Sequence, residues 1–165
     1  MLHVEPIPIL DDNYAWLLRD DATGATAVVD PAVAAPVLAR VQALGGRLDW
    51  ILITHHHGDH IADVPAVQAA TGAQVTGNAA DAHRLPKLDL AVMPGDAFAL
   101  GESRATVLDS PGHTRGHIAW AFTEGQALFC GDTLFSIGCG RLLEGDAAEM
   151  FASLQRFAAL PDDVR

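Results

Sequence analysis

Cysteine, basic residues and long apolar segments are all scarce in this sequence, and each shortage excludes a class of protein. Cys130 and Cys139 are the only cysteines. Two thiols cannot make a disulfide scaffold or a cysteine-rich zinc site, so a reducing cytosol is the predicted compartment. No apolar run approaches the roughly 18 residues of a membrane-spanning helix. Residues 1–6 carry neither a basic leader nor an apolar signal core, so secretion is not expected.

Positive charge is also in short supply. The chain has 10 Lys and Arg against 21 Asp and Glu, a formal net charge of -11. This balance argues against nucleic acid or an anionic membrane surface as a partner. An anionic small molecule remains compatible, because bound divalent ions can reverse the local field. The 165 residues, half of them hydrophobic, predict one well-buried domain over 1–165 without repeats or low-complexity segments.

The order of apolar patterns predicts strands first and then alternating strands and helices. Prolines at 6 and 8 restrict the first strand to a sheet edge. An Asp-Ala-Ala-Glu capping box at 146–149 predicts the start of the last helix. Such an order is typical of a layered α/β or α+β sandwich. The predicted strands are 2–10, 14–18, 25–29, 49–53, 73–76, 90–93, 104–108, 117–122 and 126–130, and the predicted helices are 32–44, 61–70, 78–84 and one from 146 onward.

A cluster of histidines follows the buried strand predicted at 49–53. The segment Thr-His-His-His-Gly-Asp-His occupies 54–60. Imidazole nitrogen and carboxylate oxygen are ligands that suit zinc, iron and manganese. Residues two apart in an extended segment can face the same way. His55 and His57 could therefore hold one ion, while Asp59 and His60 face a second.

Two further stretches place ligand-type residues just beyond predicted strands. They are the loop at 113–117, which contains His113 and His117, and Asp132 after the strand at 126–130. Six of the eight histidines lie in 54–60 and 113–117. A two-metal hydrolytic site explains this concentration, because metal ions can activate a water and polarise a carbonyl.

The motif at 54–60 resembles the HxHxDH signature of the metallo-β-lactamase superfamily, and its THHHxDH form is similar to that of glyoxalase II. GHTRGH at 112–117 and GDTLF at 131–135 extend the resemblance over essentially the whole chain. It implies an αββα sandwich of two mixed β-sheets flanked by helices. It also implies two divalent ions, zinc first, with iron or manganese as alternatives. The implied roles are His55, His57 and His113 as ligands of the first ion, Asp59 and His60 as ligands of the second, Asp132 as the bridge, and Asp59 as the residue that orients the bridging hydroxide.

The segment 138–145, Gly-Cys-Gly-Arg-Leu-Leu-Glu-Gly, is similar to the glyoxalase II loop in which a basic residue meets the glycine carboxylate of glutathione. The resemblance assigns that role to Arg141. Leu143 departs from the family, in which an aromatic residue is common. The remaining ligand of the second ion and a helical substrate-binding domain are implied to lie beyond residue 165, so the catalytic domain is expected to be C-terminally incomplete.

The resemblance implies hydrolysis of S-(2-hydroxyacyl)glutathione thioesters in the cytoplasm, by a monomer when the protein is complete. The partner is a small-molecule thioester, with no nucleic acid and no membrane involved. One alternative is a persulfide dioxygenase-like enzyme with a single iron. Another is an inactive, truncated fragment of the hydrolase.

The other histidines, cysteines and tryptophans have less specific interpretations. His56 is expected to be structural, and His117 to hydrogen-bond the metal loop. Asp30 fits equally well as a turn former and as a partner of a ligand histidine. We also expect surface positions for His3 and His83, buried thiols at Cys130 and Cys139, and core positions for Trp16, Trp50 and Trp120.

Overall fold

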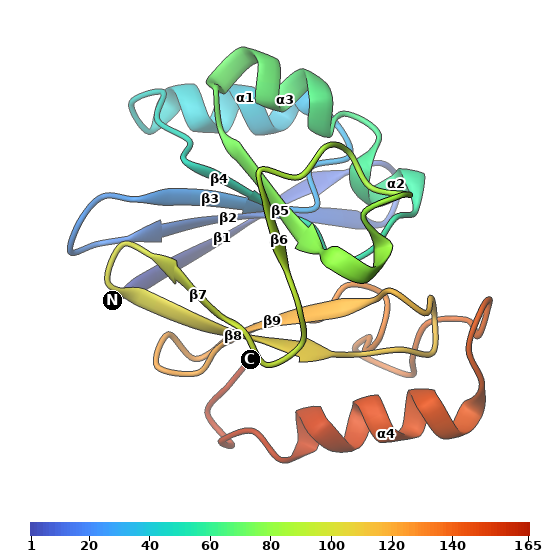
Figure 1. Cartoon of the computed structure of the whole chain (residues 1–165). Helices are drawn as coiled ribbons and strands as arrows, with labels where there is room; N and C mark the ends of the chain where they lie inside the picture. The colour runs from blue at the N-terminus through green and yellow to red at the C-terminus, as the bar shows by residue number, and fades with distance from the viewer.

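In the computed structural model, which describes residues 1–165, two β-sheets pack face to face and helices cover both outer faces (Figure 1). One sheet holds the first six strands and the other the last four. The strands are β1 (Leu2–Ile9), β2 (Asn13–Asp20), β3 (Thr26–Val29), β4 (Trp50–Leu52), β5 (Gln74–Asn78), β6 (Leu90–Val92), β7 (Ala97–Leu100), β8 (Ser103–Asp109), β9 (Ile118–Phe122) and β10 (Ala127–Phe129).

The first sheet has the order β1-β2-β3-β4-β5-β6. Its first three strands pair antiparallel and β3 to β6 pair parallel, so it is mixed, with the proline-containing β1 at an edge as predicted. The second sheet has the order β10-β9-β8-β7 and every pairing in it is antiparallel. The expected αββα sandwich is therefore confirmed, but the expectation of two mixed sheets is wrong. Short connections join neighbouring strands of the second sheet, and short connections give antiparallel pairs.

Helices complete the outer layers. α1 (Ala34–Ala43) and α3 (Val64–Thr71) lie on the first sheet, and α4 (Ala147–Ala158) lies on the second (Figure 1). The capping box at α4 is confirmed: the Asp146 carboxylate accepts the Glu149 N–H at 2.9 Å, and the Glu149 carboxylate accepts the Asp146 N–H at 3.0 Å. The short helices α2 (Gly58–Ile61) and η1 (Ala79–Asp81) follow β4 and β5. None of the helices combines the length and hydropathy needed for a membrane span.

Each face of the first sheet buries its own apolar core. Along β3 the side chains alternate, so that Val29 packs between the sheets while Val28 packs under α1 and α3. Trp120, fully buried, joins the core between the sheets, and Trp16 and Trp50 pack against that core, as expected. Because both faces are covered, β3 and β4 read as continuous apolar runs in the sequence.

Asp20, at the end of β2, ties the two sheets together away from the histidine cluster. Its carboxylate accepts the Ser103 hydroxyl, at the start of β8, at 2.8 Å and the Glu102 N–H, in the β7–β8 turn, at 3.3 Å. It also accepts the Thr23 hydroxyl at 2.6 Å. Asp20 is only 1% exposed, and these hydrogen bonds hold its pKa well below the usual aspartate value, with the Thr23 bond as the largest cause.

Some local predictions need correction. β7 was not predicted, because two alanines leave only Phe98 and Leu100 as large apolar residues between two turns. Cys130 is half-buried and Cys139 is exposed, so the expectation of two buried thiols is wrong; both are free. Cys139 lies in the exposed segment between β10 and α4, where the chain turns through glycines rather than packing against a sheet.

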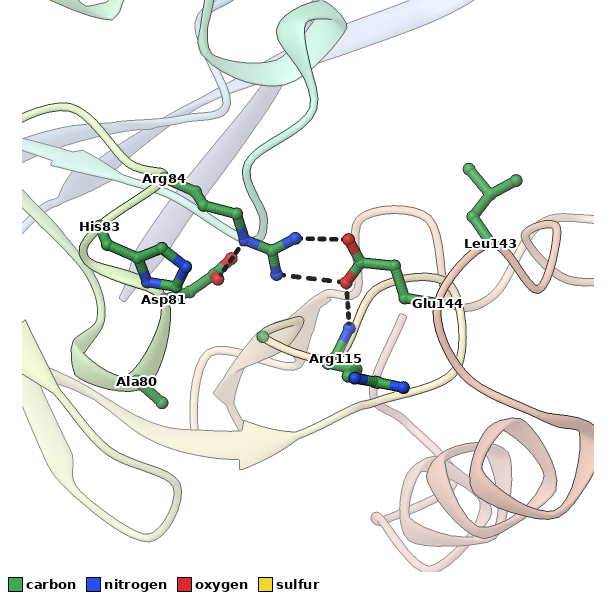
Figure 2. A pocket seen from close by; sticks show the side chains of 8 residues that line it. Ala80, Asp81, His83, Arg84, Arg115, Leu143 and Glu144 are labelled. Carbon is green, nitrogen blue, oxygen red and sulfur yellow. Dashed lines mark hydrogen bonds and ion pairs between the residues drawn. The ribbon is translucent and has the colours of Figure 1, made fainter.

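The loops that carry the predicted site residues meet at one edge of the sandwich. Residues 54–60 follow β4, residues 110–117 connect β8 to β9, and residues 130–145 follow β10. The Ile118 N–H donates to the Thr54 carbonyl at 3.0 Å, so the first two loops are joined where the sheets meet. Arg84, just after η1, reaches Glu144 of the third loop in an ion pair (Figure 2).

Candidate metal centre

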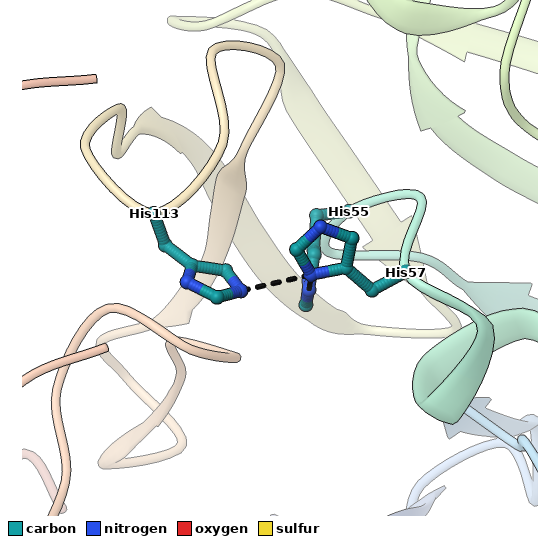
Figure 3. A group of neighbouring side chains, drawn as sticks. All are labelled: His55, His57 and His113. Carbon is teal, nitrogen blue, oxygen red and sulfur yellow. Dashed lines mark hydrogen bonds between the residues drawn. The ribbon is translucent and has the colours of Figure 1, made fainter. Parts of the chain in front are cut away.

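Three imidazoles converge from two of these loops. His55 and His57 lie on the loop that leads from β4 into α2, and His113 faces them from the loop between β8 and β9 (Figure 3). His57 Nδ1 lies 3.1 Å from His55 Nε2 and 2.9 Å from His113 Nε2. The three nitrogens lie within 4.8 Å of one another. The structure therefore brings together the three histidines predicted for the first ion.

The spacing and protonation of this histidine group suit a metal ion. Two nitrogens at about 2.0–2.1 Å from a tetrahedral ion are separated by roughly 3.3 Å. Burial lowers the pKa of His55 well below its ordinary value, and also lowers the pKa of His57. Neighbouring imidazoles lower both further. Neutral imidazoles keep a lone pair on one nitrogen, which is the form that binds metal.

A second group combines His60 with the carboxylates of Asp59 and Asp132. His60 Nε2 is buried and has no hydrogen-bond partner of good geometry. It lies 3.1 Å from Asp132 Oδ1 and 3.8 Å from Asp59 Oδ2. Burial opposes a charge on His60, but the carboxylates of Asp132 and Asp30 outweigh it and raise the pKa to about 10. The surroundings of Nε2 thus favour a cation, and a divalent ion among these three side chains would supply one.

Asp132 lies between the two groups. Its Oδ1 faces His60, and its Oδ2 lies 3.3 Å from His113 Nε2. The half-buried carboxylate follows β10 in the segment Gly131-Asp132, and its backbone N–H donates to His117 Nε2 at 3.1 Å. One carboxylate with an oxygen toward each group has the position of a bridging ligand.

Asp30, buried after β3, controls the ring orientation in both groups. Its carboxylate accepts from the Thr54 N–H at 2.8 Å, from the Thr54 hydroxyl at 2.6 Å and from His60 Nδ1 at 2.9 Å. Because the Thr54 hydroxyl donates to Asp30, its oxygen is left to accept from His55 Nδ1 at 3.0 Å. His55 and His60 therefore both present Nε2 to the site. Of the two interpretations of Asp30, the structure favours the partner of a ligand histidine.

His117 belongs to neither group. Its ring is fully buried and stacks on His55 with centroids 4.7 Å apart. Its Nδ1 is bonded to the Ser110 hydroxyl at 2.7 Å, while Nε2 accepts the Asp132 N–H. Burial lowers the pKa of His117 to about 3, so the ring is neutral and accepts at Nε2. His117 supports the loops that carry the ligands.

Arg141 lies beside the first group, and its side chain is exposed. Its carbonyl oxygen accepts from His113 Nδ1 at 2.7 Å, which leaves His113 Nε2 facing His57. A Cβ at Gly140 would collide with the backbone carbonyl of Asp132, so only glycine allows this close approach. The backbone of the 138–145 loop thus orients a predicted metal ligand.

Next to this loop is an open cavity of about 610 Å³. Arg84 and Glu144 meet at its wall (Figure 2), and Leu143 is also among its lining residues. None of the six predicted metal ligands lines the cavity, whose walls are Ala80, Asp81, His83, Arg84, Arg115, Gly116, Leu143 and Glu144.

Several residues of the site could not be identified from the sequence. The Asn13 amide donates to Asp59 Oδ2 at 3.1 Å and to the Asp59 carbonyl at 3.2 Å, although its segment indicated only a turn. His56, expected to be structural, belongs to neither ligand group, and its partners were not foreseen: Nδ1 lies 3.3 Å from the buried Asp81 Oδ2 and Nε2 3.3 Å from Arg84 Nη1. These partners are distant in sequence and belong to no local motif.

Comparison with known proteins gives consistent relatives. Residues 9–165 match the family model described as "Metallo-beta-lactamase superfamily". A curated protein of Methylococcus capsulatus, named "Hydroxyacylglutathione hydrolase", is 53% identical over 165 residues, which are 100% of this chain and 64% of that protein. The chain thus spans somewhat less than two thirds of that relative's length.

Solved structures with a similar fold are also found. The structure described as ETHE1 from Myxococcus xanthus superposes with a TM-score of 0.84 at 30% identity, covering 98% of this chain and 72% of that one. The structure described as TTHA1623 in a di-iron-bound form superposes with a TM-score of 0.80 at 29% identity, covering 96% of this chain and 87% of that one.

Proposed function

The chain belongs to the metallo-β-lactamase superfamily, and from that premise we propose that it hydrolyses S-(2-hydroxyacyl)glutathione thioesters such as S-D-lactoylglutathione. The products are glutathione and a 2-hydroxy acid. The observation that carries the proposal is Asp132, whose two carboxylate oxygens face one ligand of each group. The similarity to a protein named hydroxyacylglutathione hydrolase supports the choice of substrate.

In this proposal His55, His57 and His113 would hold one divalent ion, Asp59 and His60 would hold a second, and Asp132 would serve both. Bound divalent ions supply Lewis acidity, which activates a water and polarises the thioester carbonyl. The chain's own residues set the geometry: Asp30 fixes two histidine rings and the Arg141 carbonyl fixes a third. Asp59, half exposed and held by Asn13, orients the attacking water. The thiol leaving group is acidic enough to need little help from a general acid.

Arg141 binds the glycine carboxylate of the glutathione moiety. Arg141 is exposed, and its backbone carbonyl accepts from the ring of the predicted ligand His113. A guanidinium is well shaped for bidentate binding of a carboxylate. The exposed Leu142 and Leu143 give the same loop an apolar surface next to the charge.

Zinc is the proposed metal, since neutral imidazoles and carboxylates in small groups suit it. Iron and manganese are alternatives, and the relative in a di-iron-bound form makes iron a specific one to measure. The persulfide dioxygenase alternative uses a single iron, which would leave the second group of ligand-type side chains without a function. We further propose a cytosolic protein that is a monomer when complete, in which residues 1–165 belong to the catalytic domain.

The test combines metal content by elemental analysis with hydrolysis of S-D-lactoylglutathione by the same preparation. The proposal expects about two ions per chain together with turnover, and a loss of both metal and turnover in Asp132→Ala. One iron per chain with oxygen uptake on glutathione persulfide would support the dioxygenase instead. Two bound ions without thioester hydrolysis would refute the proposed substrate.

A further inference from the structure

The loop at 138–145, which carries Arg141, has little apolar packing of its own. Leu142 and Leu143 are 43% and 53% exposed, and Ile137 just before the loop is 98% exposed. Its position depends on polar contacts with the neighbouring loop, including Leu143 N–H to the His113 carbonyl at 3.3 Å and Gly145 N–H to the Gly112 carbonyl at 3.1 Å. Such a segment moves easily when one polar contact is lost.

Glu144 makes the side-chain contacts of this loop. Its carboxylate accepts from two nitrogens of Arg84, Nη1 and Nη2, the second at 3.2 Å (Figure 2). It also accepts the Arg115 N–H at 2.9 Å. Arg84 lies 60 residues earlier in the sequence, so one carboxylate joins three separate segments. The Arg84 partner, as the main cause, lowers the pKa of Glu144 to about 2, and the pair is ionised at neutral pH.

Arg84 itself has a rigid support. Its Nε donates to Asp81 Oδ1 at 2.6 Å, and the Asp81 side chain is 3% exposed. Asp81 packs so closely against the 112–117 loop that a Cβ at Gly116 would collide with it. Asn78, at the start of η1, donates to the Gly116 carbonyl at 2.9 Å. The guanidinium of Arg84 is thus a fixed point against which the 138–145 loop is held.

We propose that Arg84 and Glu144 are positioning residues that hold the 138–145 loop so that the Arg141 guanidinium meets the glycine carboxylate of the substrate. This inference rests on the proposed function. It adds two residues that are neither predicted metal ligands nor predicted substrate contacts. The side chains of Arg84 and Glu144 are 29% and 26% exposed, and ion pairs in that range stabilise a fold only slightly. Their principal effect is therefore on the geometry of the loop.

The test measures KM and kcat for two substrates in the metal-loaded protein. One is S-D-lactoylglutathione, and the other is the same thioester with the glycine carboxylate blocked as an ethyl ester. We expect Arg84→Ala and Glu144→Ala each to raise KM for the first substrate about tenfold, the effect of losing one charge-assisted hydrogen bond. We expect kcat to change less than about twofold, since the reacting groups are untouched.

For the blocked ester, we expect the wild-type KM to be high already, and the same substitutions should leave it nearly unchanged. The double variant should resemble either single variant, because each removes the same contact. Arg84→Lys should restore part of the affinity. The matched control is Arg40→Ala, which removes a bidentate pair with Glu5 of similar exposure on the far side of the first sheet. It should leave KM for both substrates unchanged.

Equal increases in KM for both substrates, or loss of bound metal in Arg84→Ala, would overturn the positioning role and indicate a general structural one. Hydrogen exchange gives a readout that does not need activity. The amides of Leu143 and Gly145 should exchange faster in Glu144→Ala than in Arg40→Ala. If wild-type protein with two ions hydrolyses no glutathione thioester, the proposed function fails. Unchanged exchange of those amides would separately refute the positioning of the loop.

Discussion

Asp30 offers the strongest test of how residues that hold the predicted ligands in place determine metal binding. The carboxylate is 3% exposed and accepts three hydrogen bonds, two from Thr54 and one from His60 Nδ1. Asp30→Ala would leave three buried donors without a partner, at about 1–3 kcal/mol each. It also places alanine at a φ of 50°, where a further cost of about 1–2 kcal/mol applies. We expect unfolding free energy to fall by about 4 kcal/mol or more, close to the largest single-residue effects.

Asp30→Asn separates folding from metal binding. Asparagine tolerates positive φ and keeps one acceptor oxygen for the Thr54 N–H. Its amide group, however, presents a donor where the Thr54 hydroxyl and His60 Nδ1 both donate. The hydroxyl and the ring must then reorient, and His55, which depends on Thr54, loses its fixed orientation too. We expect a stability loss of about 1–2 kcal/mol and a decrease in affinity of about 10–100-fold for both ions.

The assay is urea unfolding in chelator, paired with competition titration of zinc against a chromogenic chelator. The matched control is Asp49→Asn, since Asp49 also accepts from the backbone and hydroxyl of a threonine, Thr26, at 2.8 and 3.4 Å. Asp49 lies just before β4, at the opposite end of that strand from the metal loop. Its variant should lose stability and keep full metal affinity. Wild-type affinity for both ions in Asp30→Asn would refute the reasoning.

Three further predictions concern stability and the site backbone. Asp20→Asn should lower the unfolding free energy at pH 7 by about 1.5–3 kcal/mol, as expected for hydrogen bonds to a charged group. Because the pKa of Asp20 is lowered in the folded state, its contribution is present above the unfolded value near 4 and decreases as pH falls below it. The difference in urea midpoint between the two proteins should therefore shrink from pH 5 to pH 2.5, and a constant difference would contradict this origin. Gly140→Ala should cost about 1–3 kcal/mol of stability by overpacking and should reduce metal content by displacing Asp132, whose carbonyl it would strike; normal metal content by elemental analysis would show that the close approach is not needed. Asp146→Ala removes a capping box that contains no predicted ligand, so thermal unfolding should report a loss of about 1 kcal/mol with metal content unchanged, and a loss of metal would contradict the independence of α4 from the site.

The convergence of the predicted metal ligands could be expected because their spacing carries information within short segments. Four of the predicted ligands, His55, His57, Asp59 and His60, fall within six residues after β4. Two loops supply the others, His113 and Asp132, and all of them follow strands that the apolar pattern identifies. Parallel or paired strands deliver such loops to one edge, so convergence follows from the order of elements. The same reasoning identified both flanking helical layers and the capping box of α4.

The supporting contacts could not be predicted, because they join residues whose distance in sequence follows no rule. Two such contacts form only when the loops are in place: Arg84 with Glu144, and Asn13 with Asp59. Each is an ordinary polar residue in a turn when considered alone. Asp30 was left with two interpretations for the same reason: only the position of β3 next to β4 brings its carboxylate to Thr54 and His60. β7 was missed because small side chains weaken the alternation that marks a strand.

The alternation of side chains along β3 has a practical consequence for experiments that follow the unfolding of this protein. Val28 and Val29 are adjacent in sequence, yet one is buried under α1 and α3 and the other between the two sheets. Their methyl groups therefore act as separate reporters, one for each hydrophobic layer. In a methyl-labelled sample, the Val29 signals would broaden if the sheets separate first, and the Val28 signals if the helices detach first. Two neighbouring side chains would thus distinguish which interface opens first.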